Sequence, residues 1–517
     1  MKKITYVFSA AVLASVLVTS CDFGPKYDVE IESIVTEITS DMGSVGISEN
    51  LQSKKAFLVQ MNPSEYSLTG STDSITEKTF ASSIKMKNVP FRPKTLPVSF
   101  DSLYSGARTA SESTTETVYA VGDTKSFYSV IEDNSLNTTY AANCVCKAVG
   151  EHCYVWYKEK SGISITDSAL ENLAKKFDDI FENETYIFGS NIPKISYSNI
   201  IPVTEDTKIH IVVYDLFDDY LTTKKNQGGT FGYYYSTDML TNDYILNVLK
   251  TTEYKSNELE LINIDSFFLS ESDYEESAIS TLAHEFQHML NFVQKSLNNN
   301  RSSSVWFDEM MSMVCEDIMQ EHLGISDEAA PRSRIPTFNY GYNLGFTTWY
   351  DDDNVYASYA NAYVFGAFLL RNFGIDFIRE LAQNTYVDQE AIKQALINTN
   401  QTVTSFDEVF ENYWNVILYP DATSGWTLNK AVSKTYTING SSVAFNCTAI
   451  NPADYYIDFE EGRFYGPLVI KDEYASTVGI GPYGMLVSYI GTDLESFDVS
   501  EFTTDEALKK FYLVFTD

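Results

Sequence analysis

Positive charge is scarce in this sequence. Lys and Arg together number 36 against 71 Asp and Glu, so the formal net charge is −35 at pH 7. No dense group of basic residues interrupts this negative excess. A polyanion such as DNA or RNA would be repelled by such a chain. The composition therefore argues against a nucleic-acid partner.

Long apolar runs are missing after the first twenty residues, where no segment reaches the roughly 18 apolar residues that a transmembrane helix needs. The start of the chain differs. Basic Lys2 and Lys3 precede an apolar stretch, Phe8 to Val18, that is too short to span a bilayer comfortably. Residues 1–20 are therefore predicted to be a signal peptide, and the protein to be exported.

The predicted signal peptide ends at a cysteine. The stretch Leu17-Val-Thr-Ser-Cys21 resembles a bacterial lipobox, which implies cleavage before Cys21 and lipidation of its thiol. An ordinary secretory signal with a coincidental cysteine is the alternative. We expect a protein of the bacterial cell envelope or surface that is held at the membrane by its lipid anchor alone.

Cysteine is infrequent, and five remain once Cys21 is set aside. Export permits disulfides, but an odd number leaves at least one free thiol unless it pairs between chains. Cys146 and Cys153 are candidates to face each other across a hairpin. A metal cluster of Cys144, Cys146, His152 and Cys153 has a spacing that fits no common zinc pattern. Ordinary cysteines on β-strands are favoured.

The chain does contain enough apolar sequence for a large core. It has 517 residues, of which 44 % are hydrophobic, and this length suits about three domains. Residues 21–115 are rich in Ser and Thr and are interpreted as a tether or propeptide. Residues 116–300 combine strand and helix patterns, and residues 301–424 are mostly helical. Residues 425–517 hold short strands between turn residues, as in a β-sandwich-like domain.

Histidine is scarce too, yet two of the five stand four apart in His284-Glu285-Phe-Gln-His288. Residues four apart share one face of a helix, so both imidazoles can reach a single ion. Zn²⁺ accepts such ligands and prefers four of them. Glu285 is then placed to take a proton from a bound water. The alternative, two surface histidines on an ordinary amphipathic helix, is disfavoured by apolar neighbours on both sides.

A third ligand must come from elsewhere in the chain, because no histidine follows His288 at the metzincin spacing. Glu309 lies in the first turns of a second predicted helix, which a serine among residues 302–304 caps and Gly324 ends. A helix–loop–helix of this length can bring Glu309 beside the first helix. Glu316 lies on nearly the same helical face as Glu309. It is either an alternative ligand or a residue with a supporting, structural role next to the ligands.

Two stretches resemble a known family. His284-Glu-Phe-Gln-His288 followed by Trp306-Phe-Asp-Glu309 is similar to the H-E-F-Q-H and W-x-x-E motifs of the hyicolysin-type bacterial metallopeptidases, which are gluzincins. Segments 121–127 and 149–155 also resemble the N-terminal region of that family. The resemblance covers roughly Thr117 to Phe373.

This resemblance implies that His284, His288 and Glu309 bind zinc and that Glu285 is the catalytic base. The sequence departs from the family at Met310, where glycine is usual. A methionine at this position is expected to crowd the site.

Peptide hydrolysis also needs a group that stabilises the oxyanion beside the metal. Tyr363-Val-Phe-Gly-Ala resembles the Y-x-x-G-A stretch that supplies this group in gluzincin aminopeptidases. Tyr363 is therefore a candidate catalytic residue, and an aromatic side chain packed on a buried helix is the alternative. Residues 229–235 are expected to form an edge strand that binds the substrate backbone.

The predicted fold class is α+β: a zincin-type, thermolysin-like catalytic domain with a mixed sheet and an active-site helix, a helical subdomain and a small all-β C-terminal domain. The predicted function is hydrolysis of peptide bonds in extracytoplasmic proteins, with Zn²⁺ as the cofactor. The alternative from another class is a non-catalytic surface lipoprotein, an adhesin or binding protein with a vestigial site. An aminopeptidase is disfavoured, because no G-x-M-E-N-type exopeptidase anchor precedes the helix.

Overall fold

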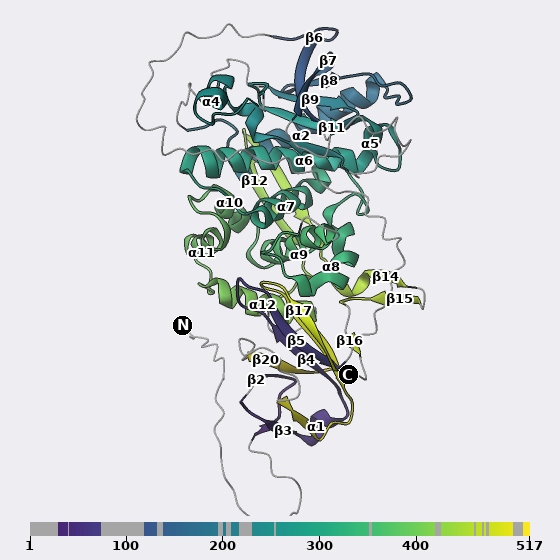
Figure 1. Ribbon diagram of the computed structural model, residues 1–517, viewed down its shortest axis with the longest axis vertical. Coiled ribbons are helices and arrows are strands. Elements are labelled where there is room, and N and C mark those ends of the chain that lie inside the picture. Colours follow the sequence, from purple (N-terminus) through teal and green to yellow (C-terminus); the bar gives the residue numbers. More distant parts are fainter. Residues whose placement is uncertain are drawn as a thin grey trace, which may run out of the picture.

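The computed structural model describes residues 29–39, 41–73, 118–131, 138–194, 200–202, 208–216, 230–252, 255–350, 354–418, 425–459, 462–467, 470–471, 475–499 and 510–516. These residues form an elongated molecule, with one sheet at the top, helices in the middle and a second sheet at the bottom (Figure 1). Residues 1–20 and Cys21 lie outside the described residues.

The upper sheet has six strands in the order β10-β11-β9-β8-β7-β6. Strand β9 runs parallel to both of its neighbours, β8 and β11. The other three neighbouring pairs are antiparallel. Every residue of β8 and β9 is buried, as expected of central parallel strands that are covered on both faces. The bounds are β6 Thr124–Ile131, β7 Thr138–Val149, β8 Cys153–Tyr157, β9 Ile209–Tyr214, β10 Gly232–Tyr234 and β11 Leu261–Asp265.

Two helices lie beneath this sheet, α2 (Asp167–Phe188) and α6 (Glu275–Asn291). The side chain of Thr166 caps α2 by accepting a hydrogen bond from the Ala169 amide. The two helices also contact each other through aromatic rings, such as Phe177 and Phe286, whose centres are 5.0 Å apart. Their apolar faces therefore share one core below the sheet.

The middle of the molecule is helical, as predicted. Helix α7 (Val305–Leu323) begins after Ser304 and ends at Gly324, whose φ of 67° is the left-handed value that glycine often adopts at a helix C-terminus. Helix α9 (Val355–Phe373) is largely buried and packs on α7. The other helices are α1 Glu49–Gln52, α4 Asn242–Asn247, α5 Ser266–Ser270, α8 Ile335–Gly341, α10 Ile375–Gln383, α11 Asp388–Asn398 and α12 Phe406–Leu418.

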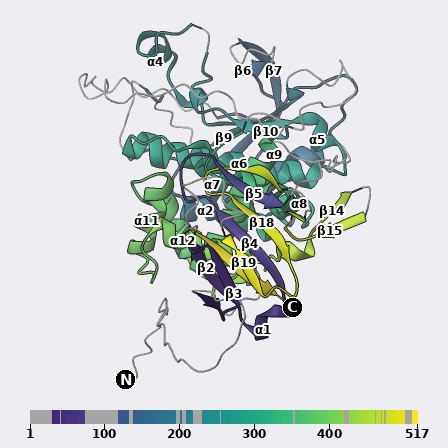
Figure 2. The same ribbon diagram turned by 60° about the horizontal axis from the view of Figure 1, so that its bottom comes forward.

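The lower sheet combines the two ends of the chain, so that N-terminal strands in purple lie beside C-terminal strands in yellow (Figures 1 and 2). Its order is β16-β18-β4-β20-β2, and two smaller groups, β1-β3-β19 and β17-β5, accompany it. The bounds are β1 Glu30–Ile31, β2 Val35–Thr39, β3 Ser44–Ile47, β4 Lys55–Met61, β5 Leu68–Asp73, β16 Ile470–Lys471, β17 Ala475–Ile480, β18 Met485–Gly491, β19 Ser496–Asp498 and β20 Lys510–Thr516.

This pairing corrects the predicted domain boundaries. Residues 30–73, interpreted as tether or propeptide, hold five strands. Residues 425–517 are not a self-contained β-sandwich, because β18 and β20 both pair with β4. Two further hairpins, β12 (Val432–Ile438) with β13 (Ser441–Cys447) and β14 (Tyr456–Phe459) with β15 (Gly462–Tyr465), pack on the helices instead. Strand pairing at such sequence separation leaves no local signal, which is why the sequence did not indicate it.

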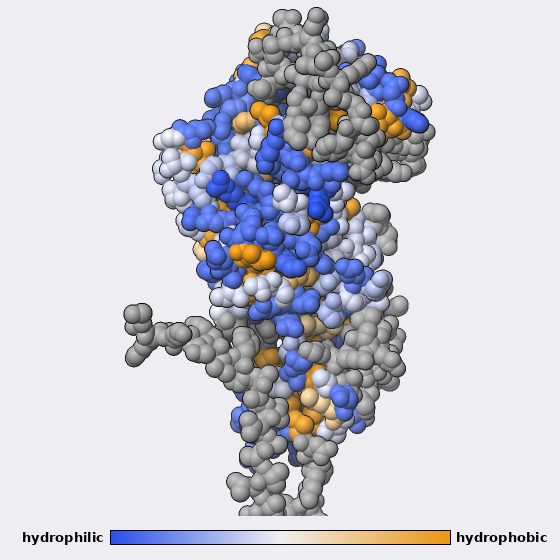
Figure 3. Space-filling model, turned by 90° about the vertical axis from the view of Figure 1, so that its left-hand side faces the viewer, coloured by the Kyte–Doolittle hydropathy of each residue, from blue (hydrophilic) through white to orange (hydrophobic). Residues whose placement is uncertain are grey.

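The core runs through the molecule from one sheet to the other. Phe286 below the upper sheet and Val59 in the lower sheet belong to the same buried cluster. The face of the molecule in Figure 3 is mostly hydrophilic across the helical middle, with hydrophobic residues in small separate groups. Among the described residues no helix is both long enough and apolar enough to cross a membrane.

Removal of residues 468–517 tests the shared sheet. The truncation deletes β16 to β20 and leaves β4 without partners on either edge, which exposes apolar side chains and unpaired amides. We expect the remainder to aggregate or to lose at least about 10 °C in Tm by circular dichroism, since a Tm falls about 2–4 °C per kcal/mol in a large domain. A chain that lacks only residues 1–28 is the control. A remainder that unfolds at the full-length Tm would show that the C-terminal strands fold separately.

Candidate metal centre

Two helices bring three metal-binding side chains together. His284 and His288 project from α6, and Glu309 projects from the start of α7. One ligand atom of each lies within 4.8 Å of the other two. The Glu309 Oε2 atom is 3.1 Å from His284 Nε2 and 3.6 Å from His288 Nε2. The structure thus places the three predicted ligands around one point.

Each histidine meets a second carboxylate with its other ring nitrogen. Glu316 Oε1 lies 2.8 Å from His284 Nδ1, and Asp308 Oδ1 lies 3.2 Å from His288 Nδ1. Ser280 donates to Glu316 at 2.7 Å, and Asn291 donates to Asp308 at 2.6 Å. Carboxylates in this position fix the ring and its tautomer, so that Nε2 is left for an ion.

The sequence reasoning gave Glu316 a supporting place but missed Asp308. Asp308 lies in the first turn of α7, where the helix dipole stabilises any carboxylate, so its presence there needs no further explanation from the sequence. Its contact with His288 depends on how α6 and α7 cross, which spacing alone does not reveal. A carboxylate directly before the third ligand was the one available signal.

The electrostatics of the site fit a cation. Burial by itself would lower the pKa of both imidazoles, but hydrogen bonds to Glu309 and Glu316 raise the pKa of His284 to about 9. The charges of Asp308 and Glu309 likewise raise the pKa of His288 to about 10. Burial opposes ionisation of Glu309, yet the two histidines hold its pKa well below the usual range. Three buried carboxylates, those of Asp308, Glu309 and Glu316, surround the two imidazoles, so the site has an excess of negative charge that a cation would balance. Two imidazoles and one carboxylate are also a donor set found in catalytic zinc sites.

Glu285 follows His284 on α6, and its carboxylate lies near enough to the three ligands to interact with their charges. Its Oε2 accepts a hydrogen bond from the backbone N–H of Tyr234 at 2.7 Å. Its Oε1 is buried and has no hydrogen-bond partner among the described residues. Burial is the main cause that raises the pKa of Glu285, and the nearby histidines oppose it. The carboxylate is thus held by one oxygen and free at the other.

The strand that holds Glu285 is β10, which is the antiparallel edge of the upper sheet. It lies inside the predicted segment 229–235, and Gly229 falls outside the described residues. A Cβ atom at Gly232 would lie 2.6 Å from the Asn263 carbonyl oxygen and 2.8 Å from Thr281 Cγ2 of α6. Only glycine lets this edge strand approach the helix so closely.

Met310 does not crowd the site, contrary to expectation. Its side chain is buried against α9, where Gly366 leaves room for it. A Cβ atom on Gly366 would lie 2.8 Å from Met310 Cγ and 2.6 Å from Val314 Cγ2. The methionine therefore fills the contact between α7 and α9.

Tyr363 lies away from the three ligands. Its hydroxyl donates a hydrogen bond to Asp317 Oδ2 at 3.3 Å, and Arg371 Nη1 binds the same oxygen at 2.7 Å. Asp317 lies about 12 Å along the helix axis from Glu309, at 1.5 Å per residue. A fully buried carboxylate needs several donors, and Tyr363 serves as one of them. The structure gives it this contact in place of the predicted oxyanion role.

The cysteines form no site either. The five described cysteines are buried, and none forms a disulfide with another. Cys146 on β7 lies opposite Trp156, so it does not face Cys153 across the hairpin. His152 stacks on Phe181, with ring centres 4.1 Å apart. Cys144, Cys146 and Cys153 lie on strands β7 and β8, whereas Cys315 lies on helix α7.

Comparison with known sequences agrees with the site. The family model described as Peptidase M30 matches residues 133–456, a span that contains α6, α7 and all three ligands. The neutral metalloprotease ShpI of Staphylococcus hyicus is 26 % identical over 316 residues, which cover 59 % of this chain and 64 % of that protein. The match thus spans less than two thirds of the length of this curated relative. The lower-sheet strands β1 to β5 and β16 to β20 lie outside the family match.

Glu316→Gln tests the support of His284. The amide cannot carry the negative charge that orients the imidazole, and loss of such a partner weakens metal binding by about 10- to 100-fold. Competition with a chromophoric chelator measures the change. Glu321→Gln, on the exposed side of the same helix, is the matched control and should leave the affinity unchanged. Equal affinities for the two variants would contradict the assigned contact.

Gly366→Ala tests the packing of Met310. The added methyl group overlaps Met310 and Val314, and overpacking of this kind costs about 1–3 kcal/mol, partly offset by about 1 kcal/mol of helix propensity. We expect a net loss of stability in urea unfolding. In a Met310→Ala background the same change should cost less, because the overlap is partly removed. An equal cost in both backgrounds would contradict the contact.

Proposed function

The chain belongs to the Peptidase M30 family, and from this membership we propose that it is a zinc-dependent endopeptidase that cleaves proteins outside the cytoplasm. One observation carries the proposal: a free carboxylate oxygen of Glu285 lies beside the buried group of His284, His288 and Glu309. The name of the relative from Staphylococcus hyicus, a neutral metalloprotease, supports the same reaction.

His284, His288 and Glu309 would hold the zinc ion and leave a fourth position open, as in catalytic zinc sites. When bound, zinc supplies a Lewis acid that lowers the pKa of water and polarises the scissile carbonyl. The two supporting carboxylates keep the histidine rings oriented toward the ion.

Glu285 would move the proton. With Oε2 held by the Tyr234 amide, Oε1 is the atom that accepts a proton from the attacking water and returns it to the leaving amine. Burial raises the pKa of this carboxyl group above its usual value, which makes it a better proton acceptor than an exposed glutamate. The fixed Oε2 contact keeps the free oxygen in position throughout.

The edge strand β10 would bind the substrate backbone. An extended peptide can add to an exposed sheet edge through main-chain hydrogen bonds. The Tyr234 amide belongs to β10 and donates a hydrogen bond to Glu285. This bond would connect the strand that binds the substrate to the catalytic base. A mixed sheet with such an edge, one helix bearing two ligands and a second bearing a glutamate is the zincin architecture of gluzincin type, and we propose this fold for the catalytic part.

We retain the proposal of a lipid anchor at Cys21, with the protein held on the bacterial envelope. It rests on the basic and apolar start of the chain and on the lipobox-like stretch. Mass spectrometry of the mature N-terminus decides it: a mature chain whose first residue is not a lipidated Cys21 would rule the anchor out.

Glu285→Gln is the decisive variant for the reaction. The amide preserves the shape but cannot accept the proton, and loss of a general base typically costs about 10²–10⁴-fold in rate. We expect zinc at one ion per chain in both proteins and hydrolysis of casein by the wild type only. Metal analysis and release of labelled peptide measure the two quantities. Wild-type protein that binds no zinc and cleaves no protein would instead support the non-catalytic binding lipoprotein.

A further inference from the structure

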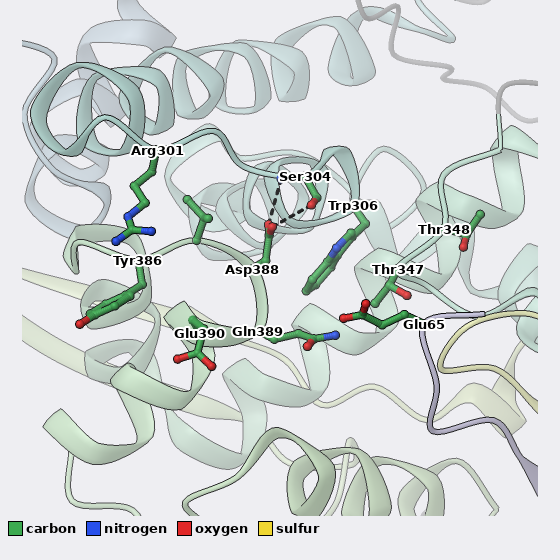
Figure 4. A pocket seen from close by; sticks show the side chains of 11 residues that line it. Glu65, Arg301, Ser304, Trp306, Thr347, Thr348, Tyr386, Asp388, Gln389 and Glu390 are labelled. Atoms are coloured by element: carbon green, nitrogen blue, oxygen red, sulfur yellow. Dashed lines mark hydrogen bonds between the residues drawn. The ribbon is translucent and has the colours of Figure 1, made fainter. Parts of the chain in front are cut away.

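A pocket of about 540 Å³ opens at the start of α7 (Figure 4). Arg301 comes from the loop before α7, and Trp306 from the start of that helix. Tyr386 comes from the segment between α10 and α11, and Glu390 from the first turn of α11. Glu65 comes from the N-terminal part of the chain, just after β4. Thr347 and Thr348 complete the lining, so four segments build one pocket of a size that holds a ligand.

The pocket and the metal centre share helix α7. Asp388 of the pocket lining also interacts electrostatically with Asp308, which contacts His288. Trp306 stands three residues before Glu309 on the same helix, which is about 5 Å along the helix axis. An extended peptide advances about 3.3–3.6 Å per residue. A peptide whose scissile bond lies at the three ligands can therefore place a side chain two or three positions away into this pocket.

The charge of the pocket is negative. Its lining includes three carboxylates, Glu65, Asp388 and Glu390, and one guanidinium, Arg301. The Arg301 guanidinium lies 5.5 Å from the centre of the Tyr386 ring and stacks over it. The lining thus holds three negative groups and one positive group. Lys393, outside the lining, pairs with Glu390 at 3.5 Å and offsets part of this negative charge.

The features that would attract an anion are already occupied. A helix N-terminus favours negative charge, but here Asp388 of this chain fills that position. Its carboxylate accepts hydrogen bonds from the Ser304 amide at 2.9 Å and from the Ser304 hydroxyl at 2.7 Å (Figure 4). Asp388 has a left-handed φ of 55°, which a non-glycine residue adopts at a cost of about 1 kcal/mol or more. Its two bonds to Ser304 fix this wall of the pocket.

We propose that this pocket binds a lysine or arginine side chain of the polypeptide substrate. The inference rests on the proposed function and names the substrate class for the same site. The aliphatic stem of the basic residue lies along Trp306, and its charged end meets Glu65 and Glu390 at the mouth. In this assignment the N-terminal part of the chain supplies a specificity group to the catalytic region.

The test compares peptides that differ only in one residue, arginine or norleucine, placed in turn at the three positions on either side of the cleaved bond. At one position the wild type should cleave the arginine peptide at least about tenfold better in kcat/KM. The double variant Glu65→Gln/Glu390→Gln should reduce this ratio about three- to tenfold, because each of these exposed carboxylates contributes up to about 1 kcal/mol as an ion pair. Glu49→Gln, an exposed carboxylate of the lower sheet region, is the matched control with an unchanged ratio.

A second readout does not depend on catalysis. Labelled arginine and norleucine peptides are titrated with the Glu285→Gln protein, with and without the two pocket substitutions, and binding is followed by fluorescence anisotropy. Tighter binding of the arginine peptide that the pocket substitutions remove supports the inference. Equal binding of both peptides, or a preference unaffected by those substitutions, overturns it. Failure of the proposed function is a different result, namely no cleavage of any peptide by wild-type protein.

Discussion

The contact between α6 and α7 is the interaction on which the rest of the site depends. The helices run antiparallel, because Ser280 near the start of α6 meets Glu316 and Asn291 at its end meets Asp308. The contact buries two imidazoles and several carboxylates, each of which would be costly alone. They are tolerated because every one has a partner across the two helices. A one-residue change of register would break all of these pairs together.

The neighbouring elements are shaped around this contact. Gly232 allows β10 to approach α6 closely enough for the Tyr234 amide to hold Glu285. On the far side, Gly366 lets Met310 pack into α9, and Asp317 joins α7 to α9 through Arg371. Glu285 and the helix that bears Glu309 are thus both held by neighbouring helices and strands, as the proposed site would require for preorganisation.

The two ends of the chain add a part that the family match does not cover. Their strands form one sheet, so neither end is a separate unit. Its apolar side joins the core of the helical region through residues such as Val59. The connection after β4 carries Glu65 to the start of the ligand helix. Residues hundreds of positions apart therefore line one pocket.

More of the site than of the fold could be predicted from the sequence alone. Helical periodicity and spacing were sufficient for His284, His288 and the helix that bears Glu309, because residues four apart must share a helical face. Gly324 marked the end of that helix, since glycine is favoured in the left-handed conformation. The supporting place of Glu316 also followed from its helical face. These features are local, and local geometry is what a sequence pattern records.

Only the tertiary structure decided the contacts that join distant segments. Tyr363 was predicted from a local resemblance, but Asp317 and Arg371 determine where its hydroxyl points. The role of Asp308 depends on the crossing of two helices, and the fit of Met310 depends on a glycine 56 positions later. The pairing of β4 with β18 and β20 was also invisible, because a strand's pattern shows which face is buried but not which partner it takes.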